Sequence, residues 1–185
     1  MRIITGKAKG KVLTAPEGLE TRPTLDRVKE ALFGSIQFEV EGAAVLDLFS
    51  GSGNIGLEAA SRGARKTVMN DHSPAAVSCI RRNTDITGLS DHVEILQKDF
   101  RDCVRFLARR GDRFDFVFID APFRTGLAVE AAGLVFSEGI LNPGGSVFVE
   151  HASDDVPACV PDLYEIVRTR RYGASSFSLL KRSNA

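Results

Sequence analysis

Apolar runs recur along most of the chain, and helical patterns lie between them. From residue 44 onward, short runs rich in Val, Ile, Leu and Phe return about every twenty to thirty residues. Strands at this spacing, each followed by a helix, specify a parallel sheet with right-handed crossovers. The predicted strands are 44–49, 67–69, 93–96, 114–119 and 146–149.

The leading helix has its own start signal. Thr24 is a suitable N-cap, and apolar residues recur at helical spacing as far as Ile36. Arg27 and Lys29 fall on its polar side, where exposed charges are expected. Further helices follow Asp71 and Asp99, and a third is predicted at 127–136, closed by Gly139 and a turn at 142–145.

Both ends of the chain depart from this rhythm. Residues 1–20 have the pattern of a short basic hairpin, and 164–171 and 175–181 form two β-like runs joined across 172–174. The second pair predicts an antiparallel hairpin that closes one edge of the sheet. With no repeat or low-complexity segment, we expect one domain comprising the hairpin extension (1–20), the leading helix (21–40) and a Rossmann-like core (41–185), with helices on both faces of the sheet.

Charge is balanced over the whole chain, at a formal net charge of zero, so any surface for nucleic acid must be a local patch. One basic patch precedes the first acid, Glu17, and another crowds the C-terminus; solvated surface charge is an equally good reading of either. The first patch contains Arg2, Lys7, Lys9 and Lys11, and the second Arg168, Arg170, Arg171, Lys181 and Arg182.

Cysteine and histidine usage argues against disulfides and metals. The three cysteines are widely spaced, and the three histidines show no ligand spacing. No apolar run approaches the roughly 20 residues of a membrane span, and the N-terminus lacks a signal-peptide core. A cytoplasmic monomer with no metal is the expectation.

The stretch VLDLFSGSGNIG at 45–56 joins a buried strand, a glycine turn and the start of a helix. Gly51, Gly53 and Gly56 fit the pattern G-x-G-x-x-G, in which the backbone approaches a ligand without an intervening Cβ. The pattern suits a dinucleotide, a nucleoside cofactor such as S-adenosylmethionine, or a purely structural turn. No proton donor or hydride-acceptor site accompanies it, which disfavours a nicotinamide oxidoreductase.

Polar residues follow all five predicted strands, where open parallel sheets bind their ligands. Asp71 lies about 20 residues after the glycine turn, the spacing of a ribose-binding carboxylate. Any one of these residues alone could be a helix cap, but five along one rim favour a ligand site. They are Asp47, Asn70 with Asp71, Asp99, Asp120 and Glu150.

The sequence Asp120-Ala121-Pro122-Phe123 suggests chemistry at an exocyclic amine. Such a nitrogen is a poor nucleophile because its lone pair is delocalised into the ring. Asp120 and a carbonyl of Ala121 or Pro122 could each accept one N–H bond and favour a pyramidal nitrogen, while Phe123 offers a stacking face for an extruded base. Without the glycine turn, a strand-end turn with a buried Phe is the simpler reading.

Taken together, VLDLFSGSGNIGLEA, QKDF and DAPF resemble a class I S-adenosylmethionine-dependent methyltransferase. The N-terminal RIITGKAKGKVL, the stretch RPT-x-DRV-x-EALF, VEH and the tail RRYGASSFSLL more narrowly resemble the RsmD-type 16S ribosomal RNA guanine-N2 methyltransferases. The likeness covers essentially the whole chain, and the RPT stretch and RYG tail are its most specific parts.

The resemblance implies a role for each matching position. The cofactor's methionine and ribose would lie against Asp47, Ser50, Gly51, Gly53 and Gly56, with Arg22 and Thr24 near the methionine end. Asn70 and Asp71 would hold the ribose, and Asp99 and Phe100 the adenine. The target base would meet Asp120, Pro122 and Phe123, and the RNA would be held by Arg2, Lys7, Lys9, Lys11 and Arg27.

Two positions depart from the family pattern. Ala121 replaces the first proline of the usual motif, and Asn70 stands where a Glu is usual, without the charge that strengthens an acceptor. We expect a looser turn and slower turnover, with function retained.

The functional hypothesis is therefore methylation of a guanine N2 amine in 16S ribosomal RNA, possibly within a small-subunit assembly particle. Two alternatives remain. One is an amino-methyltransferase for DNA adenine or protein glutamine, and the other is a non-catalytic RNA-binding protein of the same fold.

Overall fold

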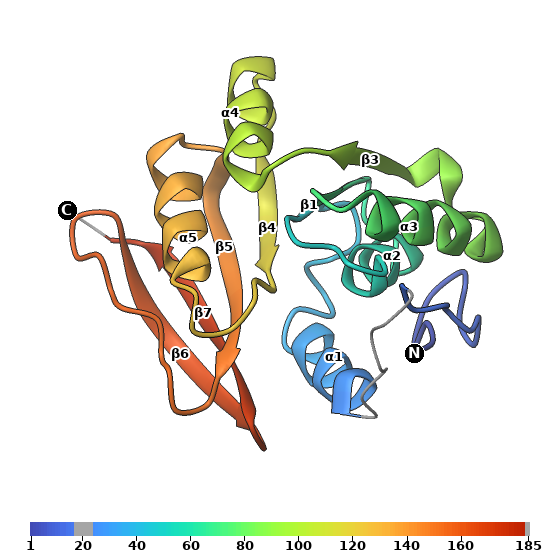
Figure 1. Ribbon diagram of the computed structural model, residues 1–185, viewed down its shortest axis with the longest axis horizontal. Helices are drawn as coiled ribbons and strands as arrows, with labels where there is room; N and C mark the ends of the chain where they lie inside the picture. The colour runs from blue at the N-terminus through green and yellow to red at the C-terminus, as the bar shows by residue number, and fades with distance from the viewer. Residues whose placement is uncertain (17–23, 184–185) are drawn as a thin grey trace.

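A seven-stranded sheet in the order β3-β2-β1-β4-β5-β7-β6 forms the centre of the molecule (Figure 1). The structure is a computed structural model that describes residues 1–16 and 24–183, without the side chains of Thr24, Leu25 and Arg27; Arg22 lies outside the described residues. Strands β1 to β5 run parallel, and β7 runs antiparallel to both β5 and β6. The strands are β1 (Ala44–Asp47), β2 (Lys66–Asp71), β3 (Val93–Gln97), β4 (Phe114–Ile119), β5 (Leu141–Ala152), β6 (Tyr164–Tyr172) and β7 (Ser175–Arg182).

Helices cover both faces of this sheet, as the sequence predicted. On one face α1 packs against Phe116 and Phe148, and α2 and α3 continue the cover towards β3. On the other face α4 and α5 enclose a second core that includes Phe114 and Val149. The helices are α1 (Thr24–Gly34), α2 (Asn54–Ser61), α3 (Pro74–Thr87), the short 3-10 helix η1 (Ser90–His92), α4 (Phe100–Arg110) and α5 (Leu127–Ser137).

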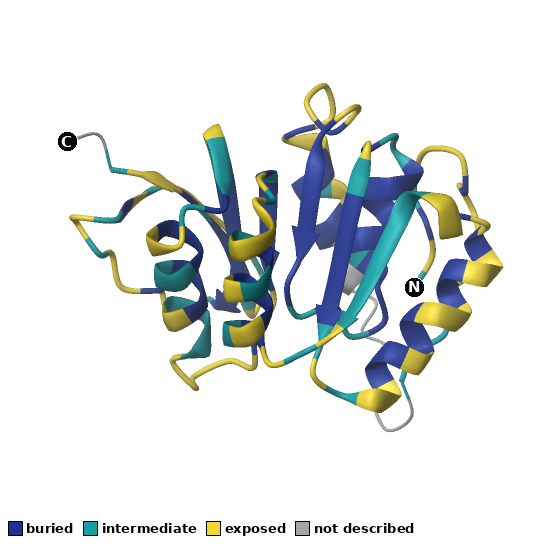
Figure 2. Ribbon diagram, turned by 90° about the horizontal axis from the view of Figure 1, so that it is seen from above, coloured by how far each residue is buried: buried dark blue, intermediate teal, exposed yellow. Residues whose placement is uncertain are grey.

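The central strands are buried on both faces, which is why their sequences are continuous apolar runs instead of alternating ones (Figure 2). All five predicted parallel strands are confirmed, as is the C-terminal hairpin, whose strand β6 forms one edge of the sheet. No helix in the described ranges is long and apolar enough to cross a membrane.

Residues 142–145 correct the sequence prediction. They were expected to form a turn, but they lie within β5, where the pairing with β4 jumps from Phe114↔Leu141 to Phe116↔Ser146. The run is therefore an irregularity in the strand, with Gly144 at a φ of 78°. Asn and Gly residues serve such a bulge as well as they serve a turn, because both features need a left-handed residue.

The N-terminal segment forms a small antiparallel loop with a single bridge, Arg2↔Val12, instead of a regular hairpin. Ile3, Ala8 and Leu13 are buried against α2 and α3.

The position of Lys29 is a second point at which the structure corrects the sequence prediction. This residue was expected on the exposed side of α1, but it is 1% exposed, because the N-terminal loop covers that side of the helix.

Candidate active site at the carboxyl ends of the strands

The glycine turn after β1 is held by a closed set of hydrogen bonds. Gly56 N donates to Asp47 Oδ2 at 2.9 Å, and the Ser50 hydroxyl donates to the Asp47 carbonyl at 2.8 Å. Gly53 N donates to the Ser50 carbonyl at 2.7 Å. These bonds fix the path of the chain from β1 into α2 before any ligand binds.

Gly56 is required by close packing behind the turn. A Cβ built on this residue would lie 2.4 Å from Met69 Cγ and 3.3 Å from Asp47 Oδ2. Gly53 adopts a φ of 79°, a left-handed conformation at the first position before α2. Both glycines therefore bring α2 against β2 and leave Ser50 and Gly51 to line the cavity in front.

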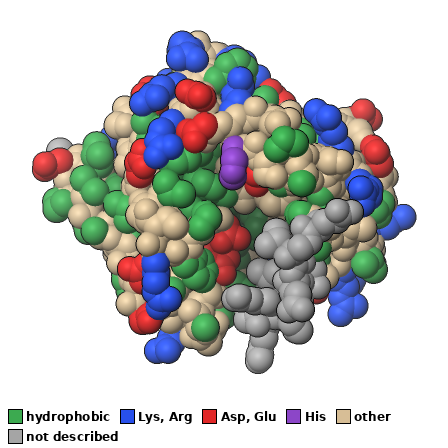
Figure 3. Space-filling view, in the orientation of Figure 1, with side chains coloured by type: hydrophobic (Ala, Val, Ile, Leu, Met, Phe, Trp, Pro, Cys, Tyr) green, Lys and Arg blue, Asp and Glu red, His purple; other side chains and the backbone are tan. Residues whose placement is uncertain are grey.

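A cavity of about 440 Å³ opens in front of this turn. Its walls come from the N-terminal segment, α1, the glycine turn and the ends of β4 and β5, with Asp47, Asp120, Phe123 and Glu150 among the lining residues. The surface is hollowed at the centre of the face in Figure 3, where acidic and hydrophobic side chains lie together. Asp47 and Asp120, predicted from sequence as site residues, therefore share one cavity.

Both carboxyl groups in this cavity have raised pKa values. Burial raises the pKa of Asp47 to about 7; the hydrogen bond from Gly56 opposes this shift, and the nearby charge of Asp120 adds to it. Asp120 is open to the cavity, and the loss of water around its carboxyl group raises its pKa to about 6. Two carboxylates in such surroundings favour a bound cation, because a positive charge would restore their ionised forms.

A second cavity, of about 190 Å³, lies on the other side of Phe49, which lines both. Asp99 and Phe100 line it at the start of α4, where Asp99 Oδ1 caps the helix by accepting from Arg101 N at 2.9 Å. Phe100 is 5% exposed and packs 5.3 Å from the Phe49 ring. The two cavities therefore lie side by side at Phe49, and the smaller one combines aromatic side chains with the polar side chains of Asn70 and Asp99.

Asn70 and Asp71 end β2 in different ways. Asn70 Nδ2 donates to the Leu48 and Lys98 carbonyls at 3.2 and 3.1 Å, whereas its buried Oδ1 has no hydrogen-bond partner in the described part of the chain. Asp71 accepts from Gly51 N and Ser73 N, both at 2.9 Å. Asp71 thus fixes the glycine turn, and the orphaned oxygen of Asn70 fits a ligand that donates a hydrogen bond.

The turn after β4 is more open than the glycine turn. Phe123 is 37% exposed and lines three cavities: the 440 Å³ cavity and two neighbours of about 530 and 660 Å³. The Thr125 hydroxyl donates to the Pro122 carbonyl at 2.6 Å. Arg124 has a φ of 60°, which is unusual for a side-chain-bearing residue, and its Nη2 donates to both carboxylate oxygens of Asp154 at 2.7 Å.

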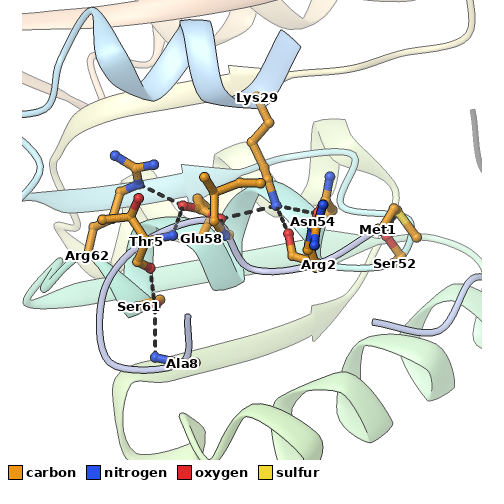
Figure 4. Close-up of polar contacts among 12 residues, drawn as sticks. Met1, Arg2, Thr5, Ala8, Lys29, Ser52, Asn54, Glu58, Ser61 and Arg62 are labelled. Carbon is orange, nitrogen blue, oxygen red and sulfur yellow. Dashed lines mark hydrogen bonds and ion pairs between the residues drawn. The ribbon is translucent and has the colours of Figure 1, made fainter. Parts of the chain in front are cut away.

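The predicted RNA-binding residues of the N-terminal loop are all exposed, namely Arg2, Lys7, Lys9 and Lys11. A buried polar cluster fastens this loop to α2 (Figure 4). Glu58, fully buried, accepts from the backbone N–H groups of Ile4 and Thr5 at 2.8 and 3.1 Å. The loop therefore holds its basic side chains on a rigid support.

Lys29 joins that cluster to the 440 Å³ cavity, which it lines. Its ammonium donates to the Arg2 carbonyl at 2.6 Å and to Asn54 Oδ1 at 2.7 Å, and pairs with Glu58 at 3.1 Å. Burial lowers the pKa of Lys29, and the ion pair with Glu58 opposes that shift. Thr24 begins α1 and Arg27 lies within it, but their side chains are outside the described part.

Three features of the site had no role predicted from sequence, although Glu150 belongs to the five strand-end residues that favoured a ligand site. Phe49 lines both cavities, Lys29 and Glu58 connect the N-terminal loop to α2, and Glu150 lines the same three cavities as Phe123. The position of Glu150 at a strand end was a usable signal. Nothing in the local pattern distinguishes Lys29 from an exposed lysine.

The chain matches one family model over almost its whole length and is similar to named ribosomal RNA methyltransferases. The family model described as conserved hypothetical protein 95 matches residues 1–181. The chain is 32% identical over 183 residues to the putative rRNA methyltransferase YlbH of Bacillus subtilis (strain 168), covering 98% of this chain and 99% of that protein. It is 31% identical over 182 residues to the ribosomal RNA small subunit methyltransferase D of Escherichia coli (strain K12), covering 98% and 90%.

Among solved structures, the putative methyltransferase yhhF from Escherichia coli matches with a TM-score of 0.84 and 32% identity, covering 99% of this chain and 98% of that one. The predicted Rossmann-like architecture of class I methyltransferases is thus confirmed. The chain belongs to the family of conserved hypothetical protein 95, the family of the RsmD-type methyltransferases.

Proposed function

We propose that the protein transfers a methyl group from S-adenosylmethionine to the N2 amine of a guanine in bacterial 16S ribosomal RNA. The observation that carries this proposal is the shared cavity of Asp47, Asp120 and Phe123, in a chain whose relatives are named ribosomal RNA small subunit methyltransferase D. A donor site and a target-base site that open into one cavity suit direct transfer.

The residues around the two cavities fit the cofactor. The smaller cavity would take the adenine against Phe49 and Phe100, which both line it, with Asp99 as the acceptor for its amine. The Asn70 Oδ1 without a partner supports a donor at this place. The larger cavity would take the positively charged methionine end, where Asp47 and Asp120 favour a cation. S-adenosylmethionine supplies an electrophilic methyl on a sulfonium, so no covalent enzyme intermediate is needed.

Asp120 would act on the target amine. Its ionised carboxylate accepts one N–H bond of the guanine N2, and a backbone carbonyl accepts the other. The Pro122 carbonyl already accepts from Thr125, which leaves it one further lone pair, so we prefer the carbonyl of Ala121 for the second bond. The nitrogen lone pair is then aimed at the methyl group, while Phe123 stacks on the extruded base. The proton released after transfer passes to Asp120 and from there to water.

The exposed cations of the N-terminal loop would position the RNA through its phosphates. Buried contacts to Glu58 and Ser61 fix the loop, so these cations keep a constant distance from the cavity. We also propose that the enzyme acts as a monomer and that its substrate is the 16S RNA within a small-subunit assembly particle.

The test is methyl transfer with labelled S-adenosylmethionine to 16S RNA, to small-subunit particles, to DNA and to a protein extract. We expect N2-methylguanosine at one position of the 16S RNA, mapped by mass spectrometry, and no label in DNA or protein. Label in DNA or protein alone would replace the proposal with a different amino-methyltransferase. Cofactor binding without transfer to any RNA would indicate a non-catalytic role.

A further inference from the structure

A groove of about 190 Å³ separates α1 from the C-terminal hairpin, away from the residues assigned above to catalysis. One wall is α1 and the turn that follows it, with Leu32 and Ile36, and the floor is aromatic, with Phe148 and Phe177. The other wall is the hairpin β6–β7, from which Arg168, Arg170 and Lys181 line the groove. The proposed function makes no use of these three cations.

The register of the hairpin alternates cations with apolar side chains on this wall. Arg168 is paired with Leu179, and Arg170 with Phe177. Directly opposed residues point to the same face of a sheet, and alternate residues of one strand are about 6.6 Å apart. The groove therefore presents two adjacent guanidinium groups above an apolar floor, the combination that binds phosphates and bases of single-stranded nucleic acid.

Among the described residues these cations form no ion pair, in contrast to others on the surface, although Glu165 stands opposite Lys181 in the register and Glu39 lines the groove. Arg110 is paired with Glu94 and Asp112, and Arg101 with Glu130. Arg168, Arg170 and Lys181 form no ion pair with any residue of 1–16 and 24–183. Charges on an edge strand also discourage strand pairing between molecules. That role does not explain Lys181, which lies on the inner strand β7 and lines the same groove.

The groove adjoins the catalytic cavities, with which it shares lining residues. Tyr172 lines both the groove and the neighbouring cavity of about 660 Å³, whose wall also contains Phe123 and Glu150. Phe177 lines both the groove and the cavity that holds Asp120. A strand whose guanine enters at Phe123 can therefore pass over Tyr172 into the groove without crossing the body of the protein.

We propose that this groove binds the single-stranded RNA on one side of the target guanine, with Arg168, Arg170 and Lys181 on its phosphates and Tyr172 as a stacking platform. The inference rests on the proposed function and extends it. The N-terminal loop and the hairpin lie towards opposite ends of the sheet (Figure 1), so the RNA is held on both sides of the cavity. The hairpin thus adds a second RNA contact to the predicted basic loop.

The test compares two charge-matched double variants of the full chain. Arg168→Gln/Arg170→Gln removes two groove cations; Arg109→Gln/Arg113→Gln removes two exposed ones at the end of α4 and just beyond it, on the opposite side of the sheet. The probe is a fluorescent oligouridine of about 20 nucleotides, long enough for a single-strand site. We expect about tenfold weaker binding for the groove variant, and a salt slope smaller by about 1.4, because each single-strand phosphate contact contributes about 0.7. The α4 variant should match the wild type.

The groove variant should also raise KM for the 16S substrate while kcat and cofactor affinity stay unchanged. Equal oligouridine binding by the two variants would overturn the RNA assignment. Unchanged binding to RNA, with methylation reduced only on the protein-bearing particle, would make the groove a protein contact and would equally overturn it. A wild type that methylates no 16S substrate would refute the proposed function, whereas the oligouridine measurement would still decide the role of the groove.

Discussion

The turns after β1 and β4 face the same cavity but are built differently. In the first, Asp47, Ser50 and Asp71 each bond to the backbone of the turn, and a Cβ on Gly56 would collide with Met69. In the second, a hydroxyl bond from Thr125 and an exposed ion pair from Arg124 hold a half-exposed Phe123. The rigid turn after β1 suits the binding of a small cofactor in a preformed site, whereas the open turn after β4 leaves room for an extruded base to enter.

Replacing the acceptor in the open turn should give the largest effect. Asp120→Asn keeps the shape of the side chain but removes the charge that accepts the amine proton. We expect kcat to fall about 10²- to 10³-fold, as when one preorganised hydrogen-bonding group is lost from a site of developing charge. Rates of methyl transfer at saturating cofactor measure it. Asp91→Asn, in the exposed helix η1, is the control, and equal rates for the two variants would remove Asp120 from the mechanism.

Overfilling the closed turn should chiefly affect stability. Gly56→Ala places a methyl group 2.4 Å from Met69 Cγ in a fully buried position, and such overpacking costs about 1–3 kcal/mol. Denaturant unfolding measures the cost, and calorimetry should show weaker cofactor binding. Gly133→Ala in α5 is the matched control, because its Cβ would meet no atom within 4 Å and alanine favours a helix. A Gly56→Ala protein as stable as the control would show that the turn is less rigid than its contacts imply.

The two turns also differ in how they should respond to pH. Asp120 acts in its ionised form, and its raised pKa of about 6 means that this form is lost as the pH falls through that value. We expect kcat/KM for the cofactor, which reports on the free enzyme, to begin to fall near pH 7, where Asp47 in the closed turn gains a proton, and to fall more steeply below pH 6, where Asp120 gains one as well. Circular dichroism over the same range controls for unfolding. A profile without an inflection near pH 6 would contradict the assignment.

The sequence predicted the sheet because its central strands are buried on both faces and appear as continuous apolar runs. It also placed Asp47, Asp99 and Asp120 along one rim, because parallel strands end on the same side of a sheet. These predictions needed only local pattern and the geometry of parallel strands.

Features that depend on distant segments were not predictable in this way. Lys29 is buried because Arg2 of the N-terminal loop and Asn54 and Glu58 of α2 surround its ammonium group. The bulge at 142–145 depends on the pairing of β5 with β4, and the same residues on their own favour a turn. The groove beside the hairpin needs the register that sets Arg170 against Phe177.

Arg124 allows a smaller test of how the open turn is held. Its φ of 60° costs about 1 kcal/mol for a residue with a side chain, and its ion pair with Asp154 is more than half exposed, so the pair contributes at most about 1 kcal/mol. Arg124→Gly relieves the backbone strain, which stabilises the protein, but it also removes the ion pair and increases the entropy of the unfolded chain, which both destabilise it. Because these effects oppose one another, we expect a free energy of unfolding within about 0.5 kcal/mol of the wild type. Asp154→Asn removes the pair and keeps the strain, and should be the less stable of the two in denaturant titrations. Because both variants lack the ion pair, their difference reports on the backbone of Arg124, and the opposite order would mean that the strain at this φ is smaller than the entropy that glycine adds to the unfolded chain.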